Sequence, residues 1–211
     1  SELTDTDGSE TLSVTISGVP TGATLSAGTD NGDGSWTLTP DQLEGLSITP
    51  AANSDADFQL TVTATTTDGT DTTSVSETLD VTVDAVADAP TLDVADAAGT
   101  EDTAIPLDIT SGLSDADGSE TLSVTISGVP AGATLSAGTD NGDGTWTLSG
   151  DQLEGLTITP AENSDEDFEL TVTATSTEGE NGDTATTTGT IAVSVDPEAD
   201  APTLVVDDAT G

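Results

Sequence analysis

The chain has 211 residues, of which 41 are acidic and none is Lys, Arg or His, so its formal charge at pH 7 is −41. This charge would repel nucleic acids and anionic membrane surfaces, and no apolar run reaches the length of a membrane-spanning helix. The absence of Cys excludes disulfides and thiolate chemistry, and the absence of His and Lys removes the usual base of a nucleophilic triad.

Two copies of one sequence make up most of the chain. Residues 7–20 recur without change as residues 117–130, and two residues inserted near Glu180–Asp183 lengthen the second copy. We expect this insertion to lie in a loop, because loops tolerate extra residues best. The repeat predicts an N-terminally incomplete first repeat at residues 1–89, a complete second repeat at residues 90–201 and the opening strand of a third repeat at residues 202–211.

Alternating segments rich in Thr, Val, Leu and Ile predict strands in the complete second copy. Alternate residues from Phe168 to Ala174 share one face, and Ile191, Val193 and Val195 share one face of the last strand. The pattern predicts an all-β fold of tandem antiparallel Greek-key β-sandwiches, with about seven strands each. The expected strands cover residues 91–95, 103–109, 122–126, 133–137, 145–148, 157–159, 168–174 and 190–195.

Glycine-rich turns separate several of these strands. Gly138–Gly144 contains Asn-Gly and Asp-Gly pairs, which are typical of hairpin turns. Its copy in the first repeat, Asp30–Gly34, resembles half an EF-hand loop, but it lacks the Glu at loop position 12 and flanking helices, so turn chemistry is favoured. We also expect a helical turn at Gln152–Leu156. Trp36 and Trp146 are interpreted as core anchors.

Four acidic groups recur along the repeat and predict a site for a hard divalent cation. Each pair alone is explained equally well as a solvated turn, but four groups without a single cationic side chain favour metal binding. Carboxylate pairs can also hydrolyse glycosides. Because the pairs recur in both copies, we expect no enzymatic activity. In the second copy the groups are Glu101-Asp102, Asp115-x-Asp117, Asp165-x-Asp167 and Asp196-x-x-x-Asp200.

Together these motifs resemble a cadherin repeat, and residues 91–202 carry the whole pattern. Cadherin repeats have an early Glu, a DxD loop, an acidic loop before a Y-x-L-x-V-x-A strand and a DxNDNxP exit. The composition is similar to the cadherin-like or Ig-like extender repeats of giant bacterial surface adhesins, often of the RTX type. The resemblance implies extracellular, cell-surface tandem sandwiches whose linkers bind Ca²⁺.

The resemblance also implies which carboxylates bind Ca²⁺. The exit Asn residues of cadherins are replaced here by Ala87 and Ala89, which implies fewer ions at each joint or more water around them. Glu120 is left out of the implied set, because the family pattern uses the DxD pair and the early Glu instead. The implied ligands are Asp55, Asp57, Asp84, Asp88, Asp115 and Asp117 between the copies, Glu101, Asp165, Asp167, Asp196 and Asp200 at the next joint, and Asp5 and Asp7 at the preceding joint.

We therefore expect structural extender repeats of an extracellular bacterial adhesin or biofilm surface protein, stiffened by Ca²⁺ at the joints between neighbouring repeats. Two alternatives stay open. Residues 202–211 repeat residues 90–99 and could add as a strand to another copy in a self-assembling filament. A carbohydrate-binding module would require more exposed aromatic side chains, or a site present in only one copy. Nucleic-acid binding and direct membrane insertion are not expected.

Overall fold

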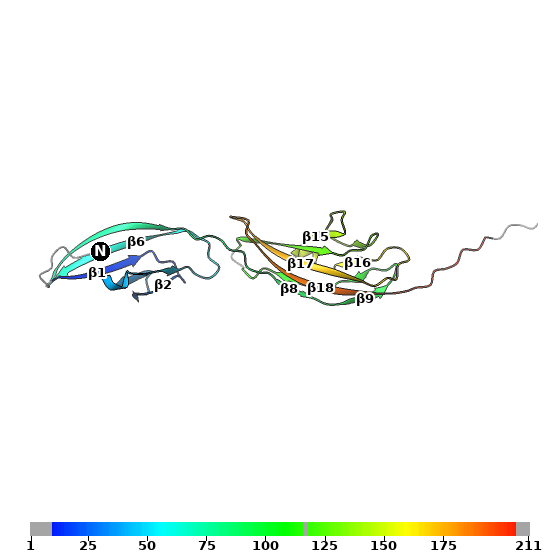
Figure 1. Ribbon diagram of the computed structural model, residues 1–211, viewed down its shortest axis with the longest axis horizontal. Helices are drawn as coiled ribbons and strands as arrows, with labels where there is room; N and C mark the ends of the chain where they lie inside the picture. Colours follow the sequence, from blue (N-terminus) through cyan, green and yellow to red (C-terminus); the bar gives the residue numbers. More distant parts are fainter. Residues whose placement is uncertain (1–9, 116–117, 206–211) are drawn as a thin grey trace, which may run out of the picture. The chain divides into compact units, whose positions relative to one another are not determined.

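The computed structural model describes residues 10–115 and 118–205. The chain divides into two compact units, Ser1–Val86 and Ala87–Gly211, which we call unit 1 and unit 2 (Figure 1). Each unit is described by itself. No helix in the described ranges has the length and hydrophobicity that crossing a membrane requires. The repeat boundaries after residues 89 and 201 stay predictions.

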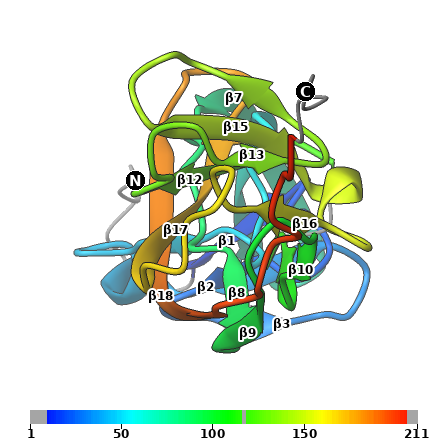
Figure 2. The same cartoon turned by 90° about the vertical axis from the view of Figure 1, so that its right-hand side faces the viewer.

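Unit 2 is a β-sandwich, which confirms the expected all-β fold. Its larger sheet has the order β14-β15-β12-β17-β18-β9, and the opposing layer consists of the sheets β10-β16-β13 and β11-β8. Figure 2 shows β17 and β18 on one side of this unit and β10 and β16 on the other. The strands are β8 (Thr91–Val94), β9 (Ala97–Thr100), β10 (Ile105–Pro106), β11 (Ile109–Gly112), β12 (Glu120–Ser127), β13 (Thr134–Leu135), β14 (Thr139–Asp140), β15 (Thr145–Ser149), β16 (Thr157–Thr159), β17 (Phe168–Glu178) and β18 (Thr184–Asp196).

The core of unit 2 lies between these layers and follows the predicted alternation. Leu170, Val172 and Ala174 on β17 are fully buried, and Ile191 and Val193 on β18 lie beside them. Successive side chains of a strand point to opposite faces, so one face of each strand is apolar and the Thr-rich face is left to solvent. Half-buried Trp146 packs against this core, which agrees with its interpretation as an anchor.

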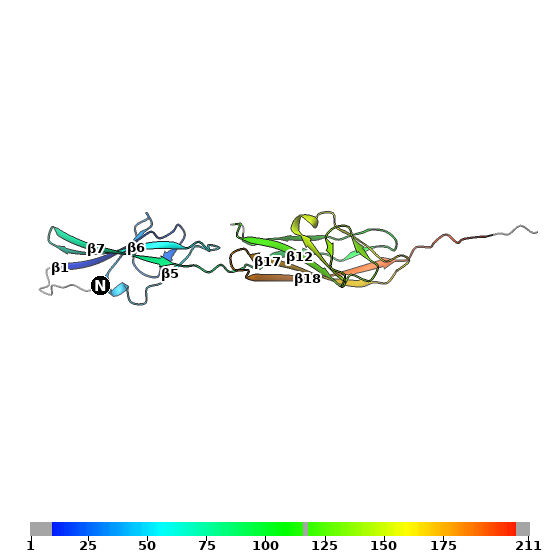
Figure 3. The ribbon, with the colours of Figure 1, turned by 90° about the horizontal axis from the view of Figure 1, so that it is seen from above.

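Unit 1 repeats the larger sheet with the order β3-β4-β1-β6-β7, beside a small β2-β5 sheet. Figure 3 shows β1, β6 and β7 side by side in this unit. Its edge strand β7 is exposed along most of its length, with Val75 and Leu79 64% and 53% exposed. The strands are β1 (Glu10–Ser17), β2 (Thr24–Leu25), β3 (Thr29–Asp30), β4 (Ser35–Leu38), β5 (Ile48–Thr49), β6 (Phe58–Asp68) and β7 (Asp71–Val81), with a 3₁₀ turn at Pro40–Gln42.

The structure corrects two expected elements of the second copy. The strand expected at residues 103–109 is split, because β10 pairs with β16 while β11 pairs with β8, and Pro106 has no N–H to continue one ladder. The helical turn expected at Gln152–Leu156 is a 3₁₀ turn at Gly150–Gln152. It starts early because the Gln152 side chain accepts a hydrogen bond from the Ser149 N–H, 3.0 Å away.

Two further features concern loops and edges. The two-residue insertion lies in the β17–β18 loop, as expected, because pairing stops at Thr177–Thr184 in unit 2 but continues to Asp68–Asp71 in unit 1. The sequence did not predict β9, which pairs in parallel with β18. Residues 201–205 form no strand, and Leu204 and Val205 are 86% and 85% exposed.

Candidate metal-binding carboxylates

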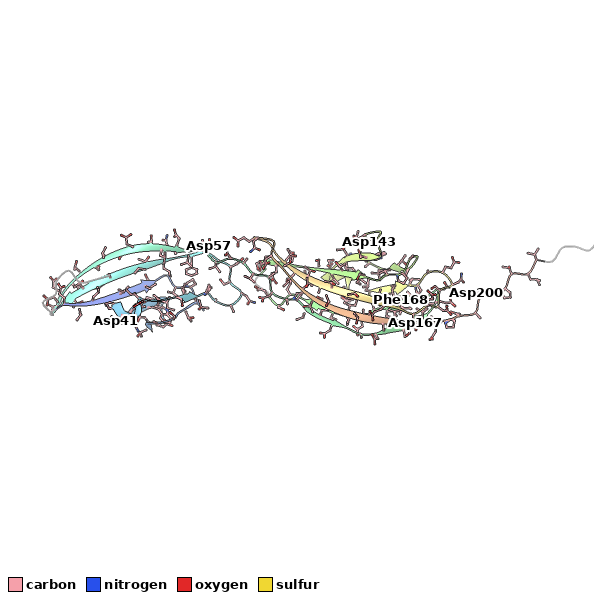
Figure 4. The ribbon with its side chains drawn as sticks, in the orientation of Figure 1. Asp41, Asp57, Asp143, Asp167, Phe168 and Asp200 are labelled. Carbon is pink, nitrogen blue, oxygen red and sulfur yellow. The ribbon has the colours of Figure 1, made fainter. Side chains whose placement is uncertain are left out.

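The first group of predicted ligands lies in unit 2 at the end where β18 ends and β17 begins. We call Glu101, Asp165, Asp167, Asp196 and Asp200 the C-terminal cluster. Figure 4 shows Asp167 and Asp200 at this end of the unit. The cluster is assembled from three parts of the chain: the turn after β9, the loop before β17 and the segment that leaves β18.

Glu101 is the buried member of the C-terminal cluster, with 7% of its surface exposed. Its N–H donates to the Asp196 carbonyl at 3.0 Å, and its Oε1 accepts from the Glu198 N–H at 2.7 Å. The early Glu and the exit segment are therefore in direct contact.

The acidic loop before β17 is fixed to the same segment. Asp167 Oδ1 accepts from the Val195 N–H at 2.8 Å, one residue before Asp196. The loop is also held to the turn after β9, since Asp102, with a φ of 61°, accepts at Oδ1 from the Asn163 N–H at 2.9 Å. Each bond joins residues far apart in the sequence, so tertiary structure brings these carboxylates to one end of the sandwich.

The donor chemistry of the C-terminal cluster fits a hard cation. All its side-chain donors are carboxylate oxygens, which Ca²⁺ prefers, and the chain has no Lys, Arg or His to neutralise them. Among residues 10–115 and 118–205, however, no three acidic side chains converge closely enough to hold a metal ion. Asp165, Asp167 and Asp196 are exposed, so binding would require their side chains to turn toward one ion.

Unit 1 repeats part of this arrangement. Asp57 Oδ1 accepts from the Val83 N–H at 2.8 Å, which is the counterpart of the bond between Asp167 and Val195. Asp55 is half-buried in the same loop, and Asp84 is exposed one residue beyond Val83. The same carboxylates are thus available at the end of unit 1 where β6 begins.

The remaining predicted ligands belong to the other end of unit 2 or lie outside the described residues. Asp88 is half-buried, and its N–H donates to Glu120 Oε1 at 2.6 Å. Asp115 is buried, with 6% of its surface exposed. Asp5, Asp7 and Asp117 lie outside the residues that the structure describes.

Two buried carboxylates lie outside the predicted set of ligands. Glu120 and Glu178 are only 6% and 3% exposed, and they face each other across the β12–β17 ladder. A signal for them was present in the sequence. Glu178 continues the inward-facing alternation of Leu170, Val172 and Ala174, and an acidic residue at such a position is rare unless it is paired.

The loops that resemble half an EF-hand use their carboxylates within the turn. Asp140 Oδ1 accepts from the Gly142 N–H at 2.8 Å, and Asp143 Oδ1 accepts from the Thr145 hydroxyl at 2.6 Å and its N–H at 3.1 Å. The two bonds from Thr145, and above all the one from its hydroxyl, hold the pKa of Asp143 below its ordinary value. Ser35 does the same for the pKa of Asp33 in unit 1. The expected turn chemistry is confirmed.

Comparison with solved structures finds that the chain has a weak similarity to a set of cadherin-like domains. It is similar to the zebrafish RET cadherin-like domains 1 to 4, with a TM-score of 0.24 and 12% sequence identity, over 90% of this chain and 41% of that one. The chain thus spans less than half the length of that structure, and at this TM-score the all-β assignment rests on the strands described above. No family model matches the chain, and the search of curated proteins finds no match.

Proposed function

We propose that the chain is a pair of structural extender repeats of an extracellular, cell-surface protein, stiffened by Ca²⁺ where one repeat follows another. The observation that carries the proposal is the repeated bond between the acidic loop and the exit strand, Asp57 to Val83 and Asp167 to Val195. This bond holds carboxylates at the end of each sandwich from which the chain leaves. A bacterial adhesin or biofilm protein is the proposed setting.

The physical basis is the charge of the chain. With 41 acidic residues and no basic ones, carboxylates that meet at a joint repel each other, and a divalent cation would convert this repulsion into attraction. Each sandwich would act as a rigid spacer, since the 13-residue strand β18 alone spans about 43 Å at ~3.3 Å per residue. A spacer role also needs no acid–base chemistry, consistent with a chain that lacks His, Lys and Cys.

The experiment compares the full chain in Ca²⁺ and in EGTA by calorimetry and small-angle X-ray scattering. At free Ca²⁺ about 100 times the Kd, one bound ion stabilises the folded state by about 2.7 kcal/mol. We expect EGTA to lower the Tm and to broaden the distance distribution as the joint loosens. A Tm and a maximum dimension that both ignore EGTA would refute the proposal.

A pair of matched variants locates the effect. The double variant D55N/D57N keeps an acceptor oxygen for the Val83 N–H but removes two proposed ligand charges. The control D41N/E44Q removes two charges from exposed positions on and beside the 3₁₀ turn of the same unit. We expect the first variant to lose most of the effect of Ca²⁺ on the Tm of unit 1 and the second to keep it. Equal responses would contradict the assigned ligands.

Strand addition is the second candidate, and the exposed Leu204 and Val205 favour it. Residues 202–205 match residues 90–93 except that Val205 replaces Asp93, and most of residues 90–93 form β8 in unit 2. If the tail adds to another copy, the full chain will form higher oligomers at rising concentration and a chain ending at residue 201 will not. Sedimentation velocity distinguishes the two, and a monomeric full chain at all concentrations would exclude the filament.

A further inference from the structure

The facing glutamates of unit 2 form a buried acidic site at the end opposite the C-terminal cluster. We call Glu120 and Glu178 the glutamate pair. Glu120 begins β12 and Glu178 ends β17, and the two are directly opposite in the antiparallel ladder. Opposed residues of such a ladder project from the same face of the sheet and have neighbouring Cβ atoms. The two carboxylates therefore share one space beside the core.

The glutamate pair lies on the core side of the sheet. Buried Ser176 and Ala174 precede Glu178 on the same face of β17, and buried Val124 follows on the same face of β12. With 6% and 3% of their surfaces exposed, the two carboxylates are more than nine-tenths buried. Burial of an uncompensated carboxylate is strongly unfavourable, and two facing each other repel as well.

The hydrogen bonds of Glu120 account for only one of its two oxygens. Its Oε1 accepts from the Asp88 N–H at 2.6 Å, whereas its Oε2 is buried and has no hydrogen-bond partner among residues 10–115 and 118–205. No side-chain cation exists anywhere in the chain to pair with it. A buried carboxylate oxygen that accepts no hydrogen bond and faces a second buried carboxylate calls for an explanation. A bound cation that is not part of the protein would provide one.

The cover over the glutamate pair comes from the lengthened β17–β18 loop and from the segment that begins unit 2. The loop lengthened by the insertion folds back, with the Glu178 N–H donating to the Asp183 carbonyl at 2.9 Å and the Gly179 N–H to the Ser119 carbonyl at 3.0 Å. Asp183 Oδ2 also accepts from the Ala87 N–H at 3.2 Å, which fixes the segment that contains Asp88. The insertion thus helps to enclose the carboxylates.

Unit 1 provides a natural comparison. The corresponding pair is Glu10 and Asp68, opposed in the same register of the β1–β6 ladder. In unit 1 a short turn joins β6 to β7. Asp68 is exposed there, and Glu10 is half-buried. The carboxylates at these positions are thus less buried in the described part of unit 1 than in unit 2.

We propose that the glutamate pair binds a divalent cation, with Ca²⁺ as the ion, within unit 2. Two carboxylates supply both charge balance and ligands, and water can complete the shell of an ion that accepts six to eight oxygens at flexible geometry. Mg²⁺ fits less well, since it requires a near-ideal octahedron and dehydrates reluctantly. The site anchors the segment 87–90 to the sheet through the bond from Asp88 to Glu120. It does not depend on the proposed function of the C-terminal cluster.

The test counts bound Ca²⁺ on the full chain by equilibrium dialysis and isothermal titration with CaCl₂ alone. The variant E120Q/E178Q is compared with E10Q/D68N, which makes the same changes at the matching positions of unit 1. We expect the first variant to bind one ion fewer than the wild type and the second to bind the same number. An unchanged count in E120Q/E178Q overturns the proposal, whatever the variants of the C-terminal cluster or of Asp55 and Asp57 do.

A second measurement does not depend on the folding of a variant. In amide NMR spectra of the wild type, Ca²⁺ should shift the signals of Asp88 and Gly179 in a saturable way and leave that of Asp68 unchanged. The alternative is a proton shared between the two glutamates. It predicts that those signals ignore Ca²⁺. That result would overturn the metal site.

Discussion

Replacement of Glu101 tests whether the C-terminal cluster is held by its hydrogen bonds as well as by an ion. Glu101→Ala removes a side chain with 7% exposure and leaves the Glu198 N–H without the acceptor now 2.7 Å away. Hydrogen bonds to charged groups contribute about 1.5–3 kcal/mol. For a domain of about 100 residues, a loss of 1 kcal/mol lowers the Tm by about 4 °C or more, so we expect a decrease of about 6–12 °C in the unit 2 transition.

The assay is differential scanning calorimetry of the full chain in EGTA, where no ion contributes. Glu101→Gln is the matched variant, because its amide oxygen can still accept from Glu198 while the charge is gone. We expect it to retain most of the Tm in EGTA but to lose the part of the Ca²⁺ stabilisation that the C-terminal cluster contributes. The unit 1 transition is the internal reference and should not move. An alanine variant whose unit 2 transition stays within about 2 °C of the wild type would refute the reasoning.

Three further predictions concern other parts of the fold. Thr145→Val should return the pKa of Asp143 toward its ordinary 3.8, as followed by NMR titration, because the lowering comes mainly from the Thr145 hydroxyl. The folded-state pKa of Asp143 lies below its unfolded value. The stabilisation that the Thr145–Asp143 bond gives to the folded state is therefore present above about pH 4 and is lost as the pH falls through the folded pKa. Gly128→Ala should destabilise unit 2 strongly in urea titrations, because its Cβ would lie 2.6 Å from a β17 carbonyl, whereas Gly142→Ala, at a similar φ with open space around it, should cost only about 1–2 kcal/mol. Ile158→Ala should cost about 2–5 kcal/mol in the same assay, because the side chain is fully buried.

The all-β fold and the faces of its longest strands were predictable from the sequence, because they depend on neighbours along the chain. The alternation from Leu170 to Ala174 places side chains on one face of any strand, whatever lies opposite. The hairpin at Asp140 and Asp143 follows from turn residues that bond to their own backbone. The alignment of the two copies also located the two-residue insertion in the loop before the last strand.

Only the tertiary structure decided which segments pair across long separations. The parallel contact of β9 with β18 joins residues almost a whole unit apart, and the split between β10 and β11 arises because two different strands offer partners to one segment. Neither pairing can be predicted from the local alternation of apolar and polar residues, because short segments such as Ala97–Thr100 show little alternation.

The acidic residues divide in the same way. The sequence identified Glu101 and Asp167 through spacing that resembles a known repeat, and the structure brings both to the strand that leaves unit 2. It left Glu120 aside, because the family pattern uses the DxD pair and the early Glu instead. Burial of Glu120 depends on Glu178 across the sheet and on Asp88 from another segment, and such contacts exist only after the chain has folded. Local patterns therefore determined the strands, and contacts between distant segments determined which carboxylates lost their water.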